Sequence, residues 1–166
     1  MARKKAGQVI AEKNSVSLIY STSKESLSAQ QTQKSVLESK SNTLIGFAGG
    51  MIALLLNATN DIQTMQPITK SLIFISIGLF VFSILLATFV GWVRKYRSYP
   101  NIDTLSEYYL DKPEQDVQLQ LISNFVEVWK ENSIQLERKA TILRIALTAQ
   151  TLAFILLGTV LMLSLK

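Results

Sequence analysis

Three stretches of the sequence contain no charged residue, and each is long enough to cross a lipid bilayer. They are residues 41–60, 71–93 and 145–165. A helix needs ~20 apolar residues to cross the ~30 Å hydrocarbon core, because it rises ~1.5 Å per residue. We therefore predict an all-α integral membrane protein with three transmembrane helices.

The segments around the three spans complete the predicted organisation. Thr22 and Glu25 fit the S/T-x-x-E capping box, so we expect a helix to begin at residue 23. The first and third spans are each expected to continue a preceding helix, and these extensions would form a cytoplasmic helical bundle. In chain order, the predicted segments are a flexible arm at 1–22, a cytoplasmic helix at 23–40, the first span at 41–60, an external loop at 61–70, the second span at 71–93, a cytoplasmic connector at 94–113, a cytoplasmic helix at 114–144 and the third span at 145–165.

Lysine and arginine are distributed unevenly around the spans. Many precede the first span or lie between the second and third, whereas the first loop carries only Lys70 and the tail only Lys166. By the positive-inside rule, the N-terminus and the connector are expected in the cytoplasm and the C-terminus outside the inner (plasma) membrane. Arg94, Lys95 and Arg97 follow the second span and are expected to meet anionic lipid headgroups. The net charge of +5 then reflects topology, and nucleic-acid binding is not expected.

Residue types that usually carry catalysis or bind metal are missing from the sequence. It has no cysteine and no histidine, and none of the three spans contains an acidic or basic residue. These absences remove the usual ligands of transition metals and the usual near-neutral base, and they argue against a proton relay. We predict that the protein is not an enzyme and that it uses no metal and no cofactor.

Small residues recur at helical spacing in the first two spans. Such a face lets two helix backbones approach closely in lipid. It serves either to pack the helices of one chain together or to form the seam of a homo-oligomer. The residues are Gly46, Gly49, Gly50 and Ala53 in the first span, and Ser83, Ala87 and Gly91 in the second.

Gln150 is the most polar residue that lies well inside a span. Within a single chain, its amide is expected to hydrogen-bond to a serine or threonine of a neighbouring helix, because an unpaired amide in hydrocarbon costs several kcal/mol. In a ring of subunits, Gln150 would instead line a narrow polar path with Thr148, Thr151 and Asn57. Helix packing and pore lining both stay open at this point.

The helix before the third span carries apolar residues at alternating spacings of three and four. This pattern predicts a coiled-coil seam with one polar position. The partner is either the helix at 23–40 or another copy of the chain, and a simple monomeric core is the plainer interpretation. The seam positions are Ile122, Phe125, Trp129, Asn132 and Leu136.

Three short motifs fall within residues 37–165: ESKSNTLIGFAGGMIALLLN, YPNIDTLSEYY and ENSIQLERKATILRIAL. Together they resemble the SLATT and Pycsar-type transmembrane effectors of nucleotide-signalled antiphage defence in bacteria and archaea. The resemblance implies a protein that oligomerises and permeabilises the inner membrane when a cytoplasmic sensor protein or a cyclic nucleotide signals infection. It assigns no ligand-binding residue in this sequence.

Two functions are compatible with these patterns. The first is an oligomeric inner-membrane effector or channel-like protein that perturbs the membrane in response to a cytoplasmic partner or nucleotide signal. The second is a non-conducting membrane anchor or scaffold that recruits a soluble partner through its cytoplasmic helices.

Overall fold

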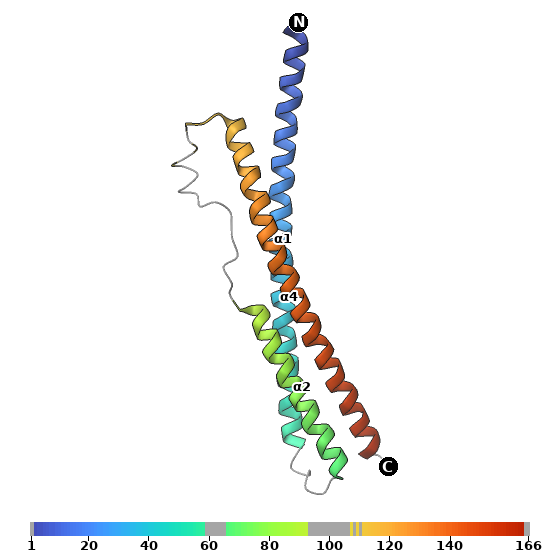
Figure 1. Cartoon of the computed structure of the whole chain (residues 1–166). Coiled ribbons are helices and arrows are strands. Elements are labelled where there is room, and N and C mark those ends of the chain that lie inside the picture. Colours follow the sequence, from blue (N-terminus) through green and yellow to red (C-terminus); the bar gives the residue numbers. More distant parts are fainter. Residues whose placement is uncertain (1, 59–65, 93–106, 108, 110, 165–166) are drawn as a thin grey trace. The chain divides into compact units, whose positions relative to one another are not determined.

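The structure of the protein is a computed structural model. It describes residues 2–58, 66–92, 107, 109 and 111–164, with side chains from Ser15 onward. These residues form the helices α1 (Ala2–Ala58), α2 (Pro67–Gly91) and α4 (Glu114–Ser164), and no strand occurs among them (Figure 1). Each helix contains a segment that is long and apolar enough to span a membrane. The predicted all-α class with three membrane-spanning helices is confirmed.

Helix α1 begins much earlier than the capping box predicted. It is helical from Ala2, so the helix start at residue 23 is wrong, and residues 2–22 of the predicted flexible arm are part of the helix. The hydroxyl of Thr22 donates to the main-chain oxygen of Leu18 at 2.9 Å. Bonding of a hydroxyl to the preceding turn is common inside helices, and here it replaces the expected cap.

The other two helices begin at or near the predicted positions. Helix α4 starts at Glu114, as predicted, and continues to Ser164 without interruption. Helix α2 starts at Pro67, within the predicted external loop, because proline suits the first turn of a helix. Lys70 therefore lies in the first turn of α2, which shows that a charge can mark the edge of an apolar stretch without ending the helix.

The chain divides into two compact units, which we describe separately. The polar unit comprises residues 1–34 and 94–136, and the apolar unit comprises residues 35–93 and 137–166. Helices α1 and α4 contribute to both units, whereas α2 belongs to the apolar unit alone.

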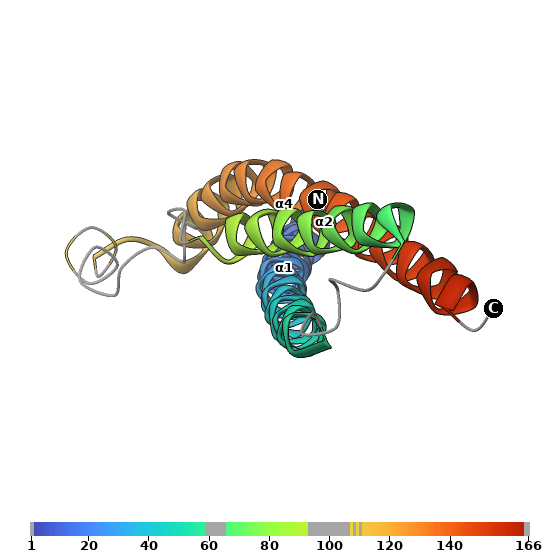
Figure 2. The same ribbon diagram turned by 90° about the horizontal axis from the view of Figure 1, so that it is seen from below.

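In the apolar unit, α1, α2 and α4 lie side by side, and α2 runs in the opposite direction to the other two (Figures 1 and 2). All three contribute to one core, which is built from Ala48, Phe80, Ala153 and Leu157. The ring of Phe154 packs edge-on against Phe80 with 5.3 Å between the ring centroids.

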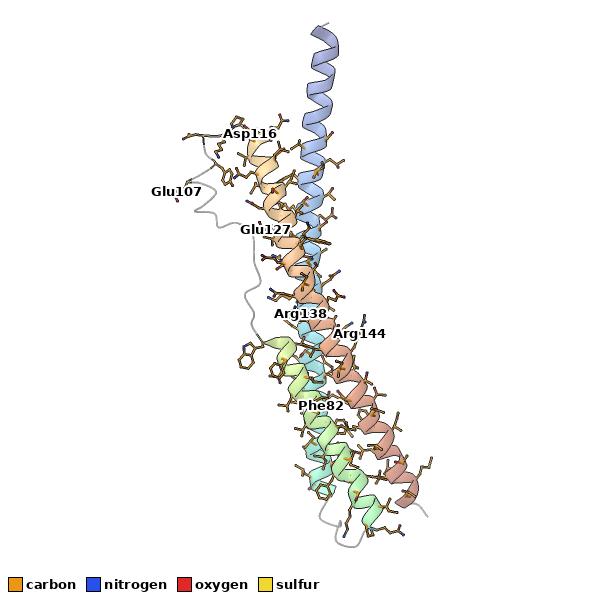
Figure 3. The ribbon with its side chains drawn as sticks, viewed as in Figure 1. Phe82, Glu107, Asp116, Glu127, Arg138 and Arg144 are labelled. Carbon is orange, nitrogen blue, oxygen red and sulfur yellow. The ribbon has the colours of Figure 1, made fainter. Side chains whose placement is uncertain are left out.

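The two faces of α2 differ in a way that suits lipid. Its buried residues recur at alternating spacings of four and three, and they include Thr69, Ser76 and Ser83. Its exposed face carries large apolar side chains such as Phe82, which is 48% exposed and is labelled in Figure 3. Buried hydroxyls beside a face of exposed large apolar side chains are the opposite of what a helix in a water-soluble protein shows. Such a helix is stable where the surroundings are hydrocarbon.

In the polar unit, the first part of α1 packs against the first part of α4. Leu27, Leu121 and Phe125 form the core, and Tyr20 stacks on Phe125 with ring centroids 5.7 Å apart. Val117 and Val128 complete the contact as half-buried side chains. A small apolar core of this kind is what a helix pair outside hydrocarbon requires.

The predicted seam on α4 is displaced by one residue at two positions. Leu121 and Val128 pack into the core where Ile122 and Trp129 were expected, and Trp129 is 44% exposed. The reason is geometric, because at 3.6 residues per turn positions 121 and 128 share the face of the buried residues while 122 and 129 lie on its flank. The remaining predicted positions are buried, and they are Phe125, Asn132 and Leu136.

Candidate functional site

The apolar unit contains a set of buried polar side chains, which we call the polar seam. A hydrogen-bonding group in such surroundings needs a partner, since an unpaired one is costly. The seam is therefore where the sequence departs from simple apolar packing, and it is the first candidate for function. Its members are Ser41 on α1, Thr69, Ser76 and Ser83 on α2, and Lys139 and Gln150 on α4.

Gln150 faces α2 of the same chain. The Oγ of Ser83 lies 3.5 Å from the Oε1 of Gln150, while the single hydroxyl proton of Ser83 is donated to the main-chain oxygen of Ala146 at 2.9 Å. The oxygen and the nitrogen of a glutamine amide can exchange places when the group turns by 180°. In the turned orientation, the NH₂ group of Gln150 donates to a lone pair of the Ser83 hydroxyl. The geometry supports the helix-packing interpretation of Gln150.

The other residues that were predicted to share a polar path with Gln150 lie elsewhere. Thr148 and Thr151 are exposed, and their hydroxyls donate to the oxygens of Arg144 and Leu147 one turn earlier on α4. Asn57 is exposed near the end of α1. Within one chain, the structure does not bring these residues together with Gln150.

A hydroxyl also joins α1 to α2. The Oγ of Ser41 donates to the main-chain oxygen of Ala87, and both residues are fully buried. A small residue at position 87 lets the two backbones approach closely enough for this bond. Ser83 and Ala87, two of the predicted small-residue positions, therefore pack inside the chain.

Lys139, a member of the polar seam, forms an ion pair with Glu38. The Nζ of Lys139 on α4 is 2.7 Å from the Oε1 of Glu38 on α1, with exposed side-chain fractions of 10% for Lys139 and 33% for Glu38. Lys139 is the one charged residue that is buried in the described part of the chain. Neither residue was predicted from the sequence, although Lys139 follows the predicted seam residue Asn132 by one heptad, and that spacing was the available signal.

The glycines of α1 are open to the surroundings of the chain. Gly46, Gly49, Gly50 and Ala53 are all exposed. A Cβ built on any of the three glycines would meet no heavy atom within 4 Å in the described residues, apart from its own local backbone. Ala48 lies between these glycines and is buried in the core with α2 and α4. The glycines therefore do not pack the three helices of one chain together.

The remaining predicted small residue, Gly91, is exposed at the end of α2. It lines a shallow groove of about 400 Å³ with Asn42, Ile45, Thr88 and Trp92. The predicted headgroup residues, which are Arg94, Lys95 and Arg97, lie outside the described residues.

The polar unit has its own buried amide and its own groove. The Nε2 of Gln30 on α1 donates to the main-chain oxygen of Trp129 on α4 at 3.1 Å, while its Oε1 accepts no hydrogen bond from the described residues. A groove of about 340 Å³ lies between the same two helices. Its lining is largely apolar and comprises Leu18, Ile19, Thr22, Ser23, Ser26, Phe125, Val126 and Trp129.

Nothing in this arrangement resembles a metal centre. The described residues contain no group of three or more His, Cys, Asp or Glu side chains that is close enough to hold a metal ion.

These observations define the class of the protein: it is a helical membrane protein whose three apolar spans bury a small set of hydrogen-bonded polar side chains and expose many large apolar ones. The Pycsar effector protein domain matches residues 22–165. The chain belongs to this family and is thus a membrane effector of antiphage defence, which confirms the resemblance of its motifs. A search of curated proteins and a search of solved structures each find no significant match.

Proposed function

We propose that the protein is an oligomeric inner-membrane effector that perturbs the membrane, without catalysis, when a cytoplasmic signal reaches its polar unit. Membership of the Pycsar effector family supports the effector role. The single observation that carries the oligomer is the open glycine face of α1.

The open glycine face, defined by Gly46, Gly49, Gly50 and Ala53, occupies one side of α1. At ~100° per residue these positions fall within an arc of ~100°. Because water cannot drive helices together in lipid, close approach over small residues is a main source of association there. The face is open in the chain, so we assign it to a second copy.

Two exposed asparagines extend the same face. Asn42 precedes it and Asn57 follows it on α1, and both are exposed. Amide side chains can hydrogen-bond between helices in a membrane, which adds about 0.6 kcal/mol for an average contact. An interface of this composition gives a reversible assembly, as an effector that must stay inactive before infection requires.

Disulfide crosslinking tests the interface directly. The chain has no cysteine, so a single Gly49→Cys substitution reports only on that position. We expect rapid formation of a disulfide-linked dimer on oxidation in membranes. The matched control is Gly158→Cys on α4, which is also exposed with no heavy atom near its Cβ. Equal crosslinking at both positions would contradict the proposed interface.

A bulky residue on the face tests whether the assembly perturbs the membrane. Gly50→Leu is expected to lower both crosslinking through an added Asn57→Cys and the release of dye from proteoliposomes at least tenfold. Gly158→Leu, which adds the same bulk on α4, is expected to leave both unchanged. Full dye release by a Gly50→Leu protein that no longer crosslinks would exclude the oligomer as the active form.

The proposed orientation places the N-terminus inside the cell and the C-terminus outside. The excess of Lys and Arg before the first span and between the last two supports it. Ser28→Cys and Gln66→Cys put one thiol at an exposed position on each predicted side. A membrane-impermeant maleimide should label only the Gln66→Cys protein in intact spheroplasts, and the reverse result would invert the topology.

The alternative function, a non-conducting scaffold, is favoured by one observation, the apolar groove of the polar unit. A partner helix seated there would cover Leu18, Val126 and Trp129. A Trp92→Phe variant leaves Trp129 as the single indole, so its emission reports on the groove during titration with a cyclic nucleotide or with a sensor protein. Blue-shifted emission without any dye release would favour the scaffold, and blue-shifted emission with release would favour the effector.

A further inference from the structure

Lys139 occupies a position that apolar or small residues fill further along the helix. It lies seven residues after Asn132 and seven before Ala146, and all three are buried on α4. A lysine there must bring its ammonium group out of water. The carboxylate of Glu38, 2.7 Å away on α1, is the partner that makes this burial possible.

The ion pair lies close to the predicted ends of the first and third spans. Glu38 is three residues before Ser41, and Lys139 is six residues before Ile145, where the uncharged stretches begin. At ~1.5 Å per residue these separations are ~4.5 Å and ~9 Å along the helices. The pair therefore joins α1 to α4 at the level where the spans are predicted to leave the membrane.

A buried ion pair is a poor choice if only stability matters, because two apolar side chains of similar size usually stabilise a helix contact as well or better. It differs from an apolar contact in its dependence on distance and direction. A rotation or slide that separates the two charged atoms leaves both charges partly desolvated, so the contact tends to be either made or broken. Contacts with this property suit a switch between two helix arrangements.

We propose that the Glu38–Lys139 pair is a latch that holds α1 against α4 in the resting state and that opens when the effector is activated. This inference rests on the proposed effector function, since a latch requires a resting and an active state. The nearby bond from Ser41 to Ala87 keeps α1 against α2, so opening of the latch changes the α1–α4 contact first.

Three variants of the ion pair and two matched control variants test the latch. Glu38→Gln and Lys139→Met each remove one charge and keep most of the side-chain volume. The double variant E38K/K139E reverses the pair and restores the attraction. Lys40→Met and Arg138→Met are the controls, because these residues are exposed neighbours of the pair on the same two helices.

Spin labels provide a readout that does not depend on membrane perturbation. We would label Ser39→Cys on α1 and Thr141→Cys on α4, two exposed positions beside the pair in the apolar unit, and measure the distance between the labels in nanodiscs. Each single-charge variant should broaden or lengthen the distance distribution, and E38K/K139E should return it to that of the unmodified pair. An unchanged distribution in both Glu38→Gln and Lys139→Met would overturn the latch.

Dye release without any added signal is the second readout. Glu38→Gln and Lys139→Met should each raise spontaneous release at least tenfold, whereas E38K/K139E and both control variants should match the parent. Single-charge variants that separate the labels and release no dye would support the latch while arguing against the effector function. Single-charge variants that melt at lower temperature with unchanged label distances would show that the pair is only structural, which also overturns the proposal.

Discussion

The hydroxyl of Ser83 on α2 donates to the main-chain oxygen of Ala146 on α4, and it does so at 2.9 Å between two residues that are fully buried. This bond joins two helices at a point where water has no access. Ser83→Ala should remove it and lower the free energy of unfolding by about 0.6 kcal/mol, with ~1.7 kcal/mol as the upper bound for such contacts in membranes. Thermal melts in detergent, followed by circular dichroism, measure the change.

Ser71→Ala is the matched control for that bond. Ser71 is exposed on the same helix, and its hydroxyl donates to the oxygen of Pro67 within α2. Its removal breaks no contact between helices, so the melting temperature should stay constant. Equal losses in the two variants would show that the Ser83 bond adds nothing beyond local helix stability.

Gln150→Leu separates the two roles that the sequence left open for this residue. Because Gln150 is 5% exposed and faces Ser83 of the same chain, the variant should retain dye release and lose only about 0.6 kcal/mol of stability, as for one average contact between membrane helices. Proteoliposome release and a thermal melt check both outcomes. A normal fold combined with lost release would return Gln150 to the lining of a polar path.

Phe80→Ala should destabilise the apolar unit strongly. The side chain is fully buried at the meeting point of three helices and packs edge-on against Phe154, so its truncation leaves a cavity and should cost about 3 kcal/mol or more. Phe82→Ala, two positions away on the exposed face, should change the melting temperature little. Similar losses at the two positions, measured in the same detergent, would mean that α2 is not packed as described.

Gln30→Leu should leave the stability of the polar unit unchanged or raise it. The substitution removes one hydrogen bond, worth about 1 kcal/mol, and also removes a buried oxygen that accepts no bond from the described residues, which costs about 1–3 kcal/mol. Gln31→Leu, at an exposed position one residue away, serves as the control. A fall in the melting temperature that is confined to Gln30→Leu would show that its oxygen has a partner in solution.

The fold was largely predictable because absence of charge over a sufficient length admits few structures other than a membrane helix. The start of α4 at Glu114 was predicted from a different signal, in which Asp111 caps the helix, Pro113 occupies its first turn and Glu114 completes the capping box. The start of α1 was missed because a Thr and a Glu three positions apart also occur inside helices, and nothing after Thr22 distinguishes the two cases. A helix end that is marked by two side chains is a weaker signal in the sequence than a span that is marked by about twenty uncharged residues.

The candidate site was less predictable from the sequence, since it depends on which faces of the helices pack against one another. Small residues on α1 and α2 carry the same local signal, yet Ser83 and Ala87 are buried within the chain while Gly46 and Gly50 are open. The Glu38–Lys139 pair joins residues that are far apart in the sequence, and each residue alone resembles an ordinary helix-surface charge. Only the heptad spacing of Lys139 from Asn132 pointed to its burial.

Burial of Lys139 also limits the direction in which α4 can travel along its own axis. A shift of one turn toward the Ser164 end would carry this ammonium group ~5.4 Å closer to the hydrocarbon. The opposing force would grow with depth, because a lysine at the bilayer centre costs at least ~2.5 kcal/mol. Turning about the axis leaves the depth of the ammonium group unchanged and is opposed only by the pairing with Glu38. The charge of Lys139 thus makes movement of α4 along its axis toward the membrane more costly than rotation of the helix about that axis.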